Sequence, residues 1–299
     1  MFRVLTFNVL APNFANPKYY PADCHDCLNR EQRRSNIMRL LSSVKDSYDV
    51  IALQEVTDDT IISTTDIRFG EYQYYRSVLT GFAGMFIAHD STHWSDYFGV
   101  DPEFSYIRNG NALFFRHEMF AVQMWNDISL STGDHALMGM VIHKPTMKQL
   151  RIINVHFDNE SDSIRRTELH NLFSVIPCNA NIIDLIMGDF NTNMTDISDL
   201  LDEFSFTDTL SEVGDTRSTY ALFIGKDGPI DNIIHRGESI KTLSSEVLDH
   251  NLWTTYPILD RRDLLDPLGT KRLNECIRLF GSDHMPVAAT FTLDNITSQ

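Results

Sequence analysis

Polar side chains that can bind cations or transfer protons recur where apolar runs of the sequence end or begin. Asparagine, glutamate, histidine and aspartate follow such runs, and further acidic residues lie just before others. These residues are Asn8, Glu55, His156, Asp189, Asn191, Asp231, Asp283 and His284. Because rigid strands can direct several side chains from the edge of a sheet toward one point, we expect these residues to form a single site.

The residue types in this set match the hydrolysis of a phosphodiester. That reaction requires a cation on the phosphoryl oxygens, a group that orients or deprotonates water, and donors that neutralise the developing charge. Glu55, assisted by Asn8 and Asp283, offers the oxygen ligands that suit Mg²⁺ or Mn²⁺. No thiolate pattern or multi-histidine spacing favours zinc. The sequence therefore predicts a Mg²⁺ or Mn²⁺ cofactor.

Two short spacings assign further roles. Asp189 and Asn191 belong to one tight turn, so an acceptor and a donor can hold a water molecule and an oxyanion together. Asp283 and His284 are adjacent, so their side chains point apart, and His284 needs a separate carboxylate partner. Asp231 is available for that role.

Simpler explanations exist for parts of this pattern. Asp and Asn residues often cap loops and turns at strand ends, and His156 could be a buried histidine with satisfied hydrogen bonds. We expect substrate contacts at Asn111, Asn154, Arg165 and Arg166, although the two arginines could instead form the solvated face of a helix. The aromatic residues between Phe82 and Tyr106 could stack on bases or could belong to the core.

A framework of strands with a few intervening helices must position these residues. The alternation and length of the apolar runs predict strands at Phe2–Phe7, Val50–Leu53, Ala112–Phe115, Phe120–Met124, Ala136–Ile142, Arg151–Val155, Asn181–Met187, Ile230–Ile234 and Val287–Phe291. Helical spacing predicts helices at Asn29–Val44, Asp58–Ile67, Ser163–Ser174 and Ile197–Glu203. The stretch from Tyr72 to Tyr106 is aromatic and irregular. We expect sheet packed on sheet with outer helices, in one domain over residues 1–299.

Composition limits the class of protein and of partner. The 299 residues are 42% apolar, enough for a sizeable core. The formal charge of −16 disfavours non-specific binding to nucleic acid. Catalysis at one phosphate is still compatible with this net charge, since a bound cation makes the local charge of the site positive. No apolar run approaches the roughly 20 residues that span a bilayer. We therefore expect a monomer without a membrane partner, in the cytoplasm or otherwise intracellular, with the nucleus also open.

Four cysteines do not suggest a disulfide framework. Cys24 and Cys27 form a C-x-x-C pair, but a structural zinc site needs four ligands, and Cys178 and Cys276 lie singly and far away. We expect reduced thiols in an ordinary loop; a zinc or redox role is the alternative.

Seven motifs in order along the chain resemble those of the endonuclease/exonuclease/phosphatase superfamily. They are TFNVL (6–10), ALQEV (52–56), GNALFFR (110–116), NVHF (154–157), MGDFN (187–191), PIDNII (229–234) and SDHMPV (282–287). The resemblance implies an α/β fold of four layers, in which two packed mixed β-sheets are flanked by helices, as in DNase I. One departure is Asn232, where the family often has an aromatic residue after the aspartate.

The same resemblance implies a role for each motif residue. Glu55 would be the principal metal ligand, assisted by Asn8 and with Asp283 near the metal. Asp189 would orient the nucleophilic water. The remaining roles concern phosphate: Asn191 would bind it, His156 would bind it from the other side, and His284, held by Asp231, would contact it as base or charge stabiliser.

Within the superfamily, two stretches of sequence resemble the carbon catabolite repression deadenylase, nocturnin and Angel branch. They are the opening TFNVLAP and the segment that runs from Arg30 through Arg39 to DVIALQEV. This implies a metal-dependent phosphodiesterase acting on nucleic acid, a 3′–5′ exoribonuclease of deadenylase type with single-stranded RNA as its partner. Two other activities on the same fold stay open, a DNA-repair endonuclease or phosphodiesterase and a phosphatase for a small phosphoester. A non-catalytic interaction domain is the alternative of another class.

Overall fold

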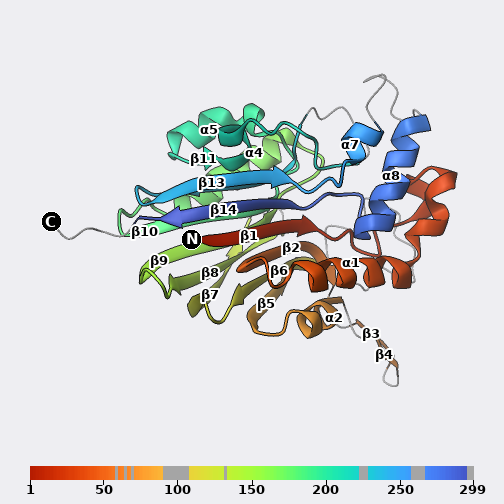
Figure 1. Cartoon of the computed structure of the whole chain (residues 1–299), viewed down its shortest axis with the longest axis horizontal. Coiled ribbons are helices and arrows are strands. Elements are labelled where there is room, and N and C mark those ends of the chain that lie inside the picture. Colours follow the sequence, from red (N-terminus) through yellow and green to blue (C-terminus); the bar gives the residue numbers. More distant parts are fainter. Residues whose placement is uncertain are drawn as a thin grey trace.

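Two six-stranded sheets form the centre of the molecule (Figure 1). The computed structural model describes residues 1–57, 60–63, 66–68, 71–89, 108–130, 133–221, 228–256 and 267–294. The first sheet has the order β13 (Ile240–Val247), β14 (Val287–Leu293), β1 (Phe2–Asn8), β2 (Val50–Thr57), β6 (Asn109–Arg116) and β5 (Phe82–Ala88). The second has the order β11 (Thr207–Asp208), β12 (Asp231–Arg236), β10 (Ile182–Asp189), β9 (Lys148–His156), β8 (His135–His143) and β7 (Phe120–Ser129).

Both sheets are mixed, and helices cover their outer faces. The pairs β1–β2 and β9–β10 are parallel, whereas the other neighbouring strands run antiparallel. Helices α1 (Arg30–Val44), α2 (Glu71–Val78) and α8 (Pro267–Phe280) pack together on the side of the first sheet, with the 3₁₀ segments η1 (Pro17–Tyr19) and η2 (Ala22–Leu28). The remaining helical segments are α4 (Asp162–Val175), η3 (Met194–Ile197), α5 (Ser198–Glu203), α6 (Thr209–Val213) and α7 (Leu252–Thr255).

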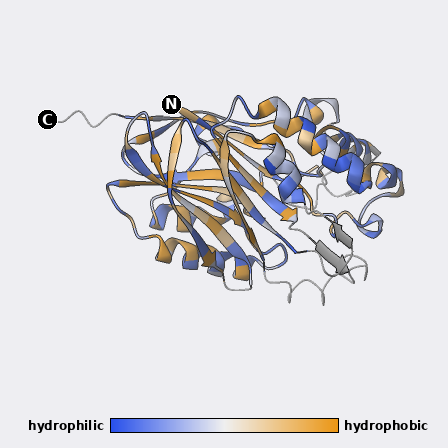
Figure 2. Cartoon of the chain, turned by 90° about the horizontal axis from the view of Figure 1, so that it is seen from below, coloured by the Kyte–Doolittle hydropathy of each residue, from blue (hydrophilic) through white to orange (hydrophobic). Residues whose placement is uncertain are grey.

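Burial explains why the central strands are continuous apolar runs. Every residue of β2 is buried, because the strand has sheet on one face and helices on the other. On the outer face of the second sheet, Ile153 and Ile186 pack against Leu169, Leu172 and Phe173 of α4. In Figure 2 orange residues gather along the strands, while the helices alternate between orange and blue. The predicted four-layer α/β sandwich is confirmed.

Two local predictions were wrong. The segment predicted as a helix at Asp58–Ile67 contains β3 (Thr60–Ser63) and β4 (Asp66–Arg68), which pair antiparallel. Its threonines and isoleucines are β-branched, which favours strands. The stretch from Tyr72 to Tyr106 is not irregular throughout, since it contains most of α2 and all of β5.

The aromatic residues of this stretch divide into two groups. Phe82 and Phe86 pack against the core, and the Tyr72 ring lies 5.5 Å from that of Phe86. These three rings therefore belong to the core rather than to a base-stacking surface. The other residues that prompted the stacking prediction, Trp94, Tyr97, Phe98 and Tyr106, lie outside the described residues, as does most of the insert after Ile87.

Strand register brings candidate site residues to the same level. Asp189, the last residue of β10, pairs with His156 of β9 on one side and with Asp231 of β12 on the other. In the first sheet, Asn8 at the end of β1 pairs with Gln54, next to Glu55. The ends of five strands thus converge. None of the helices in the described ranges is long and apolar enough to cross a membrane.

A buried ion cluster ties the second sheet together near the other end of these strands. The Asp184 carboxylate of β10 accepts hydrogen bonds from Arg151 Nε of β9 (2.6 Å) and from Arg236 Nε of β12 (2.9 Å). All three residues are buried, and Asp184 is fully inaccessible. One carboxylate therefore pairs with a guanidinium group from each neighbouring strand.

Asp184→Ala should lower the free energy of unfolding by about 3–5 kcal/mol, because it leaves two guanidinium groups buried without their anion. Urea denaturation followed by circular dichroism measures this change. Asp199→Ala is the matched control, since Asp199 forms an exposed ion pair with Arg166, and exposed pairs contribute little. Equal unfolding midpoints for the two variants would contradict the prediction.

Candidate active site

Asp189 lies at the centre of the converging strand ends. Its Oδ2 accepts a hydrogen bond from Asn8 Nδ2 at 3.0 Å, and its Oδ1 accepts one from the backbone N–H of Asn191 at 2.8 Å. Two imidazole nitrogens lie close to the same Oδ2, His156 Nε2 at 3.7 Å and His284 Nε2 at 3.8 Å. The carboxylate is almost fully buried, so its orientation is fixed by these neighbours.

Glu55 enters the site through a break in its strand. The pairing of β2 with β6 shifts register between Leu53 and Val56, and Glu55 has φ of 58°. Such a bulge redirects a side chain that regular pleating would send elsewhere. Glu55 Oε1 then accepts from Asn8 Nδ2 at 2.9 Å, and its Oε2 accepts from the backbone N–H of Ala11 at 2.7 Å.

Asn8 holds the two carboxylates in place. Its amide nitrogen donates to both Glu55 and Asp189, while its Oδ1 accepts from the backbone N–H of Leu10 at 2.9 Å. That last bond fixes which end of the amide faces the carboxylates. The geometry favours Asn8 as the residue that positions Glu55, rather than as a direct metal ligand.

Burial raises the pKa of Glu55 above its ordinary value, although His156 and the hydrogen bonds from Asn8 and Ala11 act in the opposite direction. A nearby cation would add to these opposing effects and favour the ionised carboxylate.

His284 forms the pair with Asp231 that its sequence position requires. Its Nδ1 lies 2.8 Å from Asp231 Oδ2, and Asp231 is fully buried. Burial alone would lower the pKa of His284, but the negative charges of Asp231 and Asp189 raise it to about 10. The imidazole is therefore a cation at neutral pH, with its Nε2 directed toward Asp189.

Asp283 is held by two tyrosines that the sequence analysis did not identify. Tyr20 donates its hydroxyl to Asp283 Oδ2 at 2.9 Å, and Tyr220 also hydrogen-bonds this carboxylate. Burial, and next the negative charge of Asp283, raise the pKa of both tyrosines well above its usual value, so both stay protonated donors. Asp283 Oδ1 is buried and has no hydrogen-bond partner among the residues that the structure describes. It is an acceptor available to a ligand.

His89 is a second neighbour that was missed. Its Nδ1 accepts from the backbone N–H of His135 at 3.0 Å, and its ring centroid lies 6.1 Å from that of His156. Burial, and next the positive charge of His156, lower the pKa of His89 to about 3. It is therefore neutral beside the site. A lone histidine at the end of an unpredicted strand gave no signal in the sequence.

The expected substrate contacts are placed differently from one another. Asn154 is fully buried and donates to the carbonyls of Leu53 and Ala112, both at 2.9 Å, so it joins the two sheets. Asn111 is fully buried as well and donates to the His135 carbonyl at 2.7 Å. Both positions favour a structural role over contact with substrate.

The two arginines of α4 also have partners within the chain. Arg165 is buried, donates to the Asp158 carbonyl at 2.9 Å and pairs with Asp162. Arg166 is exposed and pairs with Asp199. This position matches the alternative from the sequence, in which the arginine lies on the solvated face of a helix.

Asn191 and the C-x-x-C pair are the remaining candidates from the sequence. Asn191 has φ of 51° and donates from Nδ2 to the Phe157 carbonyl at 2.9 Å. The C-x-x-C pair is buried in η2, where Cys27 Sγ donates to the Cys24 carbonyl at 2.9 Å, and neither thiol is in a disulfide.

A family model matches this order of residues over almost the whole chain. The model is that of the Endonuclease/Exonuclease/phosphatase family, and it matches residues 5–284. The chain belongs to this family. A comparison with the curated proteins finds no match to the sequence. Endonucleases, exonucleases and phosphatases all hydrolyse phosphoesters, so the family establishes the class of chemistry.

Several solved structures share the fold across nearly their full length. The catalytic domain of human nocturnin with bound sulfate aligns at 18% identity and a TM-score of 0.64, over 98% of this chain and 93% of that one. ANGEL2, described as a 2′,3′-cyclic phosphatase, aligns at 15% identity and a TM-score of 0.63, over 97% of this chain and 94% of that one. A mannosyl-6-phosphatase of Bacteroides thetaiotaomicron aligns at 14% identity and a TM-score of 0.61, over 98% of this chain and 100% of that one. The branch expected from the motifs is thus represented, but at these identities the likeness shows the fold alone.

Asp231→Asn should lower the pKa of His284 by roughly 1–3 units from its value of about 10, because it removes the facing negative charge while burial remains. NMR titration of the imidazole resonances in EDTA measures this shift. Asp127→Asn is the control, because Asp127 contacts a different histidine, His135. An unchanged His284 titration in Asp231→Asn would contradict the assigned ion pair.

Proposed function

We propose that this member of the family is a metal-dependent phosphodiesterase that removes nucleotides from the 3′ end of single-stranded RNA, in the manner of a deadenylase. The observation that supports the chemistry best is the position of Asp189. This one carboxylate faces two imidazoles and shares the amide nitrogen of Asn8 with Glu55. A water-orienting group, two imidazoles that can bind phosphate and a metal ligand therefore lie within one small volume.

Each residue of this constellation has a role in the proposal. Asp189 orients the attacking water and accepts its proton, since its Oδ2 is directed into the group. His284, kept positively charged by Asp231, donates a hydrogen bond to the phosphoryl oxygen on which negative charge develops. His156 binds the phosphate from the other side, and the turn at Asn191 supports the position of Asp189.

The residues present fit a hard divalent cation. Glu55 and Asp283 offer carboxylate oxygens. The buried Asp283 Oδ1, which has no partner in the described part of the chain, is the kind of acceptor that a cation satisfies. Ligand atoms of Asp189, Asp231 and His284 also lie within 4.8 Å of one another. Because His284 and Asp231 already bond each other, we assign the cation to Glu55 and Asp283. When bound there, Mg²⁺ or Mn²⁺ would stabilise charge on the phosphoryl oxygens.

The choice of single-stranded RNA rests on charge and on the motifs of the opening segment. A chain of charge −16 has little long-range attraction for a duplex, so substrate must be held by contacts near the site. The TFNVLAP opening resembles the nocturnin and Angel branch. Action as a cytoplasmic monomer stays a prediction.

A small phosphoester is the second candidate substrate. The similar structures include a mannosyl-6-phosphatase as well as nocturnin. The site residues described above serve a phosphomonoester equally well, because they act on the phosphoryl group and not on the rest of the substrate.

Hydrolysis should stop in EDTA and return with Mg²⁺ or Mn²⁺, since Glu55 and Asp283 provide only oxygen ligands. Glu55→Gln should lower kcat/KM by roughly a hundredfold at a fixed Mg²⁺ concentration. Glu203→Gln, an exposed glutamate on α5, is the matched control and should behave as wild type. Equal rates in EDTA and Mg²⁺ would remove the metal from the proposal.

Labelled oligoadenylate, mixed RNA, single- and double-stranded DNA with an abasic site, and sugar phosphates should be compared at the same Mg²⁺ and salt concentrations. We expect a ladder of products shortened from the 3′ end, fastest with single-stranded RNA. Asp189→Ala serves as the inactive control, with an expected loss in kcat of roughly a hundredfold or more. Faster cleavage of the abasic duplex would favour the DNA-repair activity, and faster release of phosphate from sugar phosphates would favour the phosphatase.

A further inference from the structure

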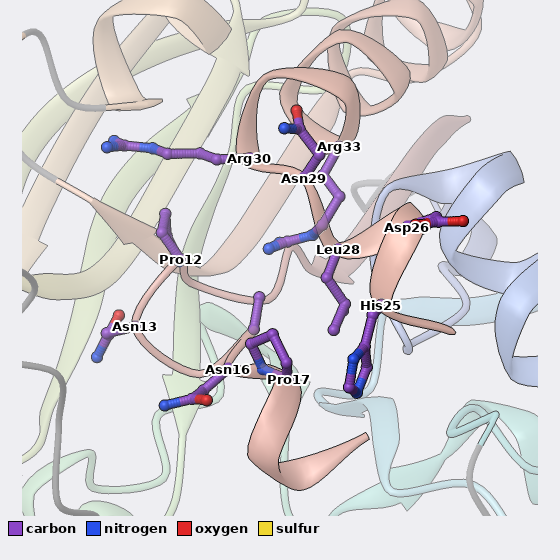
Figure 3. A pocket seen from close by; sticks show the side chains of 11 residues that line it. Pro12, Asn13, Asn16, Pro17, His25, Asp26, Leu28, Asn29, Arg30 and Arg33 are labelled. Atoms are coloured by element: carbon purple, nitrogen blue, oxygen red, sulfur yellow. The ribbon is translucent and has the colours of Figure 1, made fainter. Parts of the chain in front are cut away.

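A cavity of about 460 Å³ lies between the loop after β1 and the start of α1 (Figure 3). Part of its wall is apolar and comes from Pro12, Ala15, Pro17 and Leu28. The polar part includes Asn16, His25 and Arg30. In Figure 3, Arg30 and His25 lie at opposite edges of the lining. The volume and the mixed lining are those of a site for a small organic group.

The loop that forms this cavity is fastened to the active site at two points. The backbone N–H of Ala11 donates to Glu55, and the Tyr20 hydroxyl donates to Asp283. Pro12 directly follows Ala11, and consecutive Cα atoms are about 3.8 Å apart. The apolar wall therefore begins within the length of one nucleotide from Glu55, the proposed metal ligand.

Buried Arg33 fixes the shape of the same loop. It donates from Nη2 to the Val9 carbonyl at 3.1 Å and from Nε to the Gly281 carbonyl at 2.9 Å, and it also bonds the carbonyl of Leu10. These bonds use Nε and Nη2 of Arg33 for the protein backbone, and the residue is only 3% exposed. Among the arginines of the lining, Arg30 is therefore the one placed to meet a ligand.

Arg30 is oriented by a chain of hydrogen bonds that starts on β2. Thr57, two residues after Glu55, donates from Oγ1 to Glu71 Oε2 at 3.0 Å, and Arg30 donates from Nε to Glu71 Oε1 at 3.3 Å. Glu71 is buried, whereas the Arg30 side chain is 23% exposed. In the part of the chain that the structure describes, the two Nη groups of Arg30 have no partner. A guanidinium held in this way can bind a phosphate with both remaining nitrogens.

We propose that this cavity binds the nucleotide next to the scissile phosphodiester, with its unpaired base against the proline and leucine wall and its phosphate on Arg30. A base has flat apolar faces and a polar edge, which matches the divided lining, whereas a sugar phosphate offers no flat apolar face. A base paired in a duplex is not free to enter. The inference rests on the proposed function and adds a substrate requirement to it: an unpaired strand of at least two nucleotides.

Binding can be measured without turnover in an Asp189→Asn background, by fluorescence anisotropy of labelled RNA tetranucleotide with Mg²⁺. Arg30→Ala should weaken binding about tenfold, and Arg30→Lys should recover part of the loss by keeping a positive charge beside Glu71. Arg39→Ala is the matched control, because Arg39 is exposed on α1 and is absent from the cavity lining. Asn16→Trp, which places a ring in the cavity, should weaken binding without removing a charge.

Equal affinity of the Arg30→Ala and Arg39→Ala variants, or unchanged affinity of Asn16→Trp, would overturn the assignment. In the active enzyme, Arg30→Ala should raise KM for the tetranucleotide more than KM for bis(4-nitrophenyl) phosphate, which has no neighbouring nucleotide. An equal rise for both substrates would also overturn it. If no phosphodiester is hydrolysed but Arg30-dependent binding persists, the proposed function fails and the nucleotide site stands. If RNA is hydrolysed with an unchanged KM in Arg30→Ala, the proposed function stands and the nucleotide site fails.

Discussion

The amide nitrogen of Asn8 bonds two carboxylates that come from different sheets, and the geometry of the site depends on this interaction. Glu55 belongs to the first sheet and Asp189 to the second. Their separation is therefore set by how the sheets pack. Asn154 fixes that packing a short distance away, through the carbonyls of Leu53 and Ala112. Because buried amides without partners are costly, a small slip between the sheets would be opposed at both places.

The sequence was most informative where strands are buried on both faces. Such strands read as unbroken apolar runs, so β2 and β10 were identified and the residues that follow them, Glu55 and Asp189, could be grouped. Edge strands lack this signal. In β13, IKTLSSEV, only Ile240, Ser245 and Val247 are buried, so the strand forms no apolar run and was not predicted. The segment predicted as a helix at Asp58–Ile67 contains strands, because its threonines and isoleucines are β-branched.

Contacts between distant segments account for what the sequence could not disclose about the site. Tyr20 and Asp283 are 263 residues apart, and no local pattern links a tyrosine in a proline-rich loop to a motif near the other end. Residue type alone also does not reveal which partners a side chain already has. Asn154 has the polarity of a substrate contact but spends its hydrogen bonds inside the core, and Arg166 has the charge of a phosphate ligand but faces Asp199. Burial, which decides between such roles, follows from tertiary packing.

Three residues without glycine's conformational freedom adopt left-handed backbone angles at the site: Leu10, Glu55 and Asn191, with φ between 51° and 58°. Each such residue costs on the order of 1 kcal/mol, which the surrounding structure must offset. Glycine at Leu10 would relieve part of this strain, yet it would also free the segment that carries Ala11 to Glu55. Thermal robustness and catalytic accuracy are thus opposed at these positions, and variants selected only for heat resistance would tend to lose activity there first.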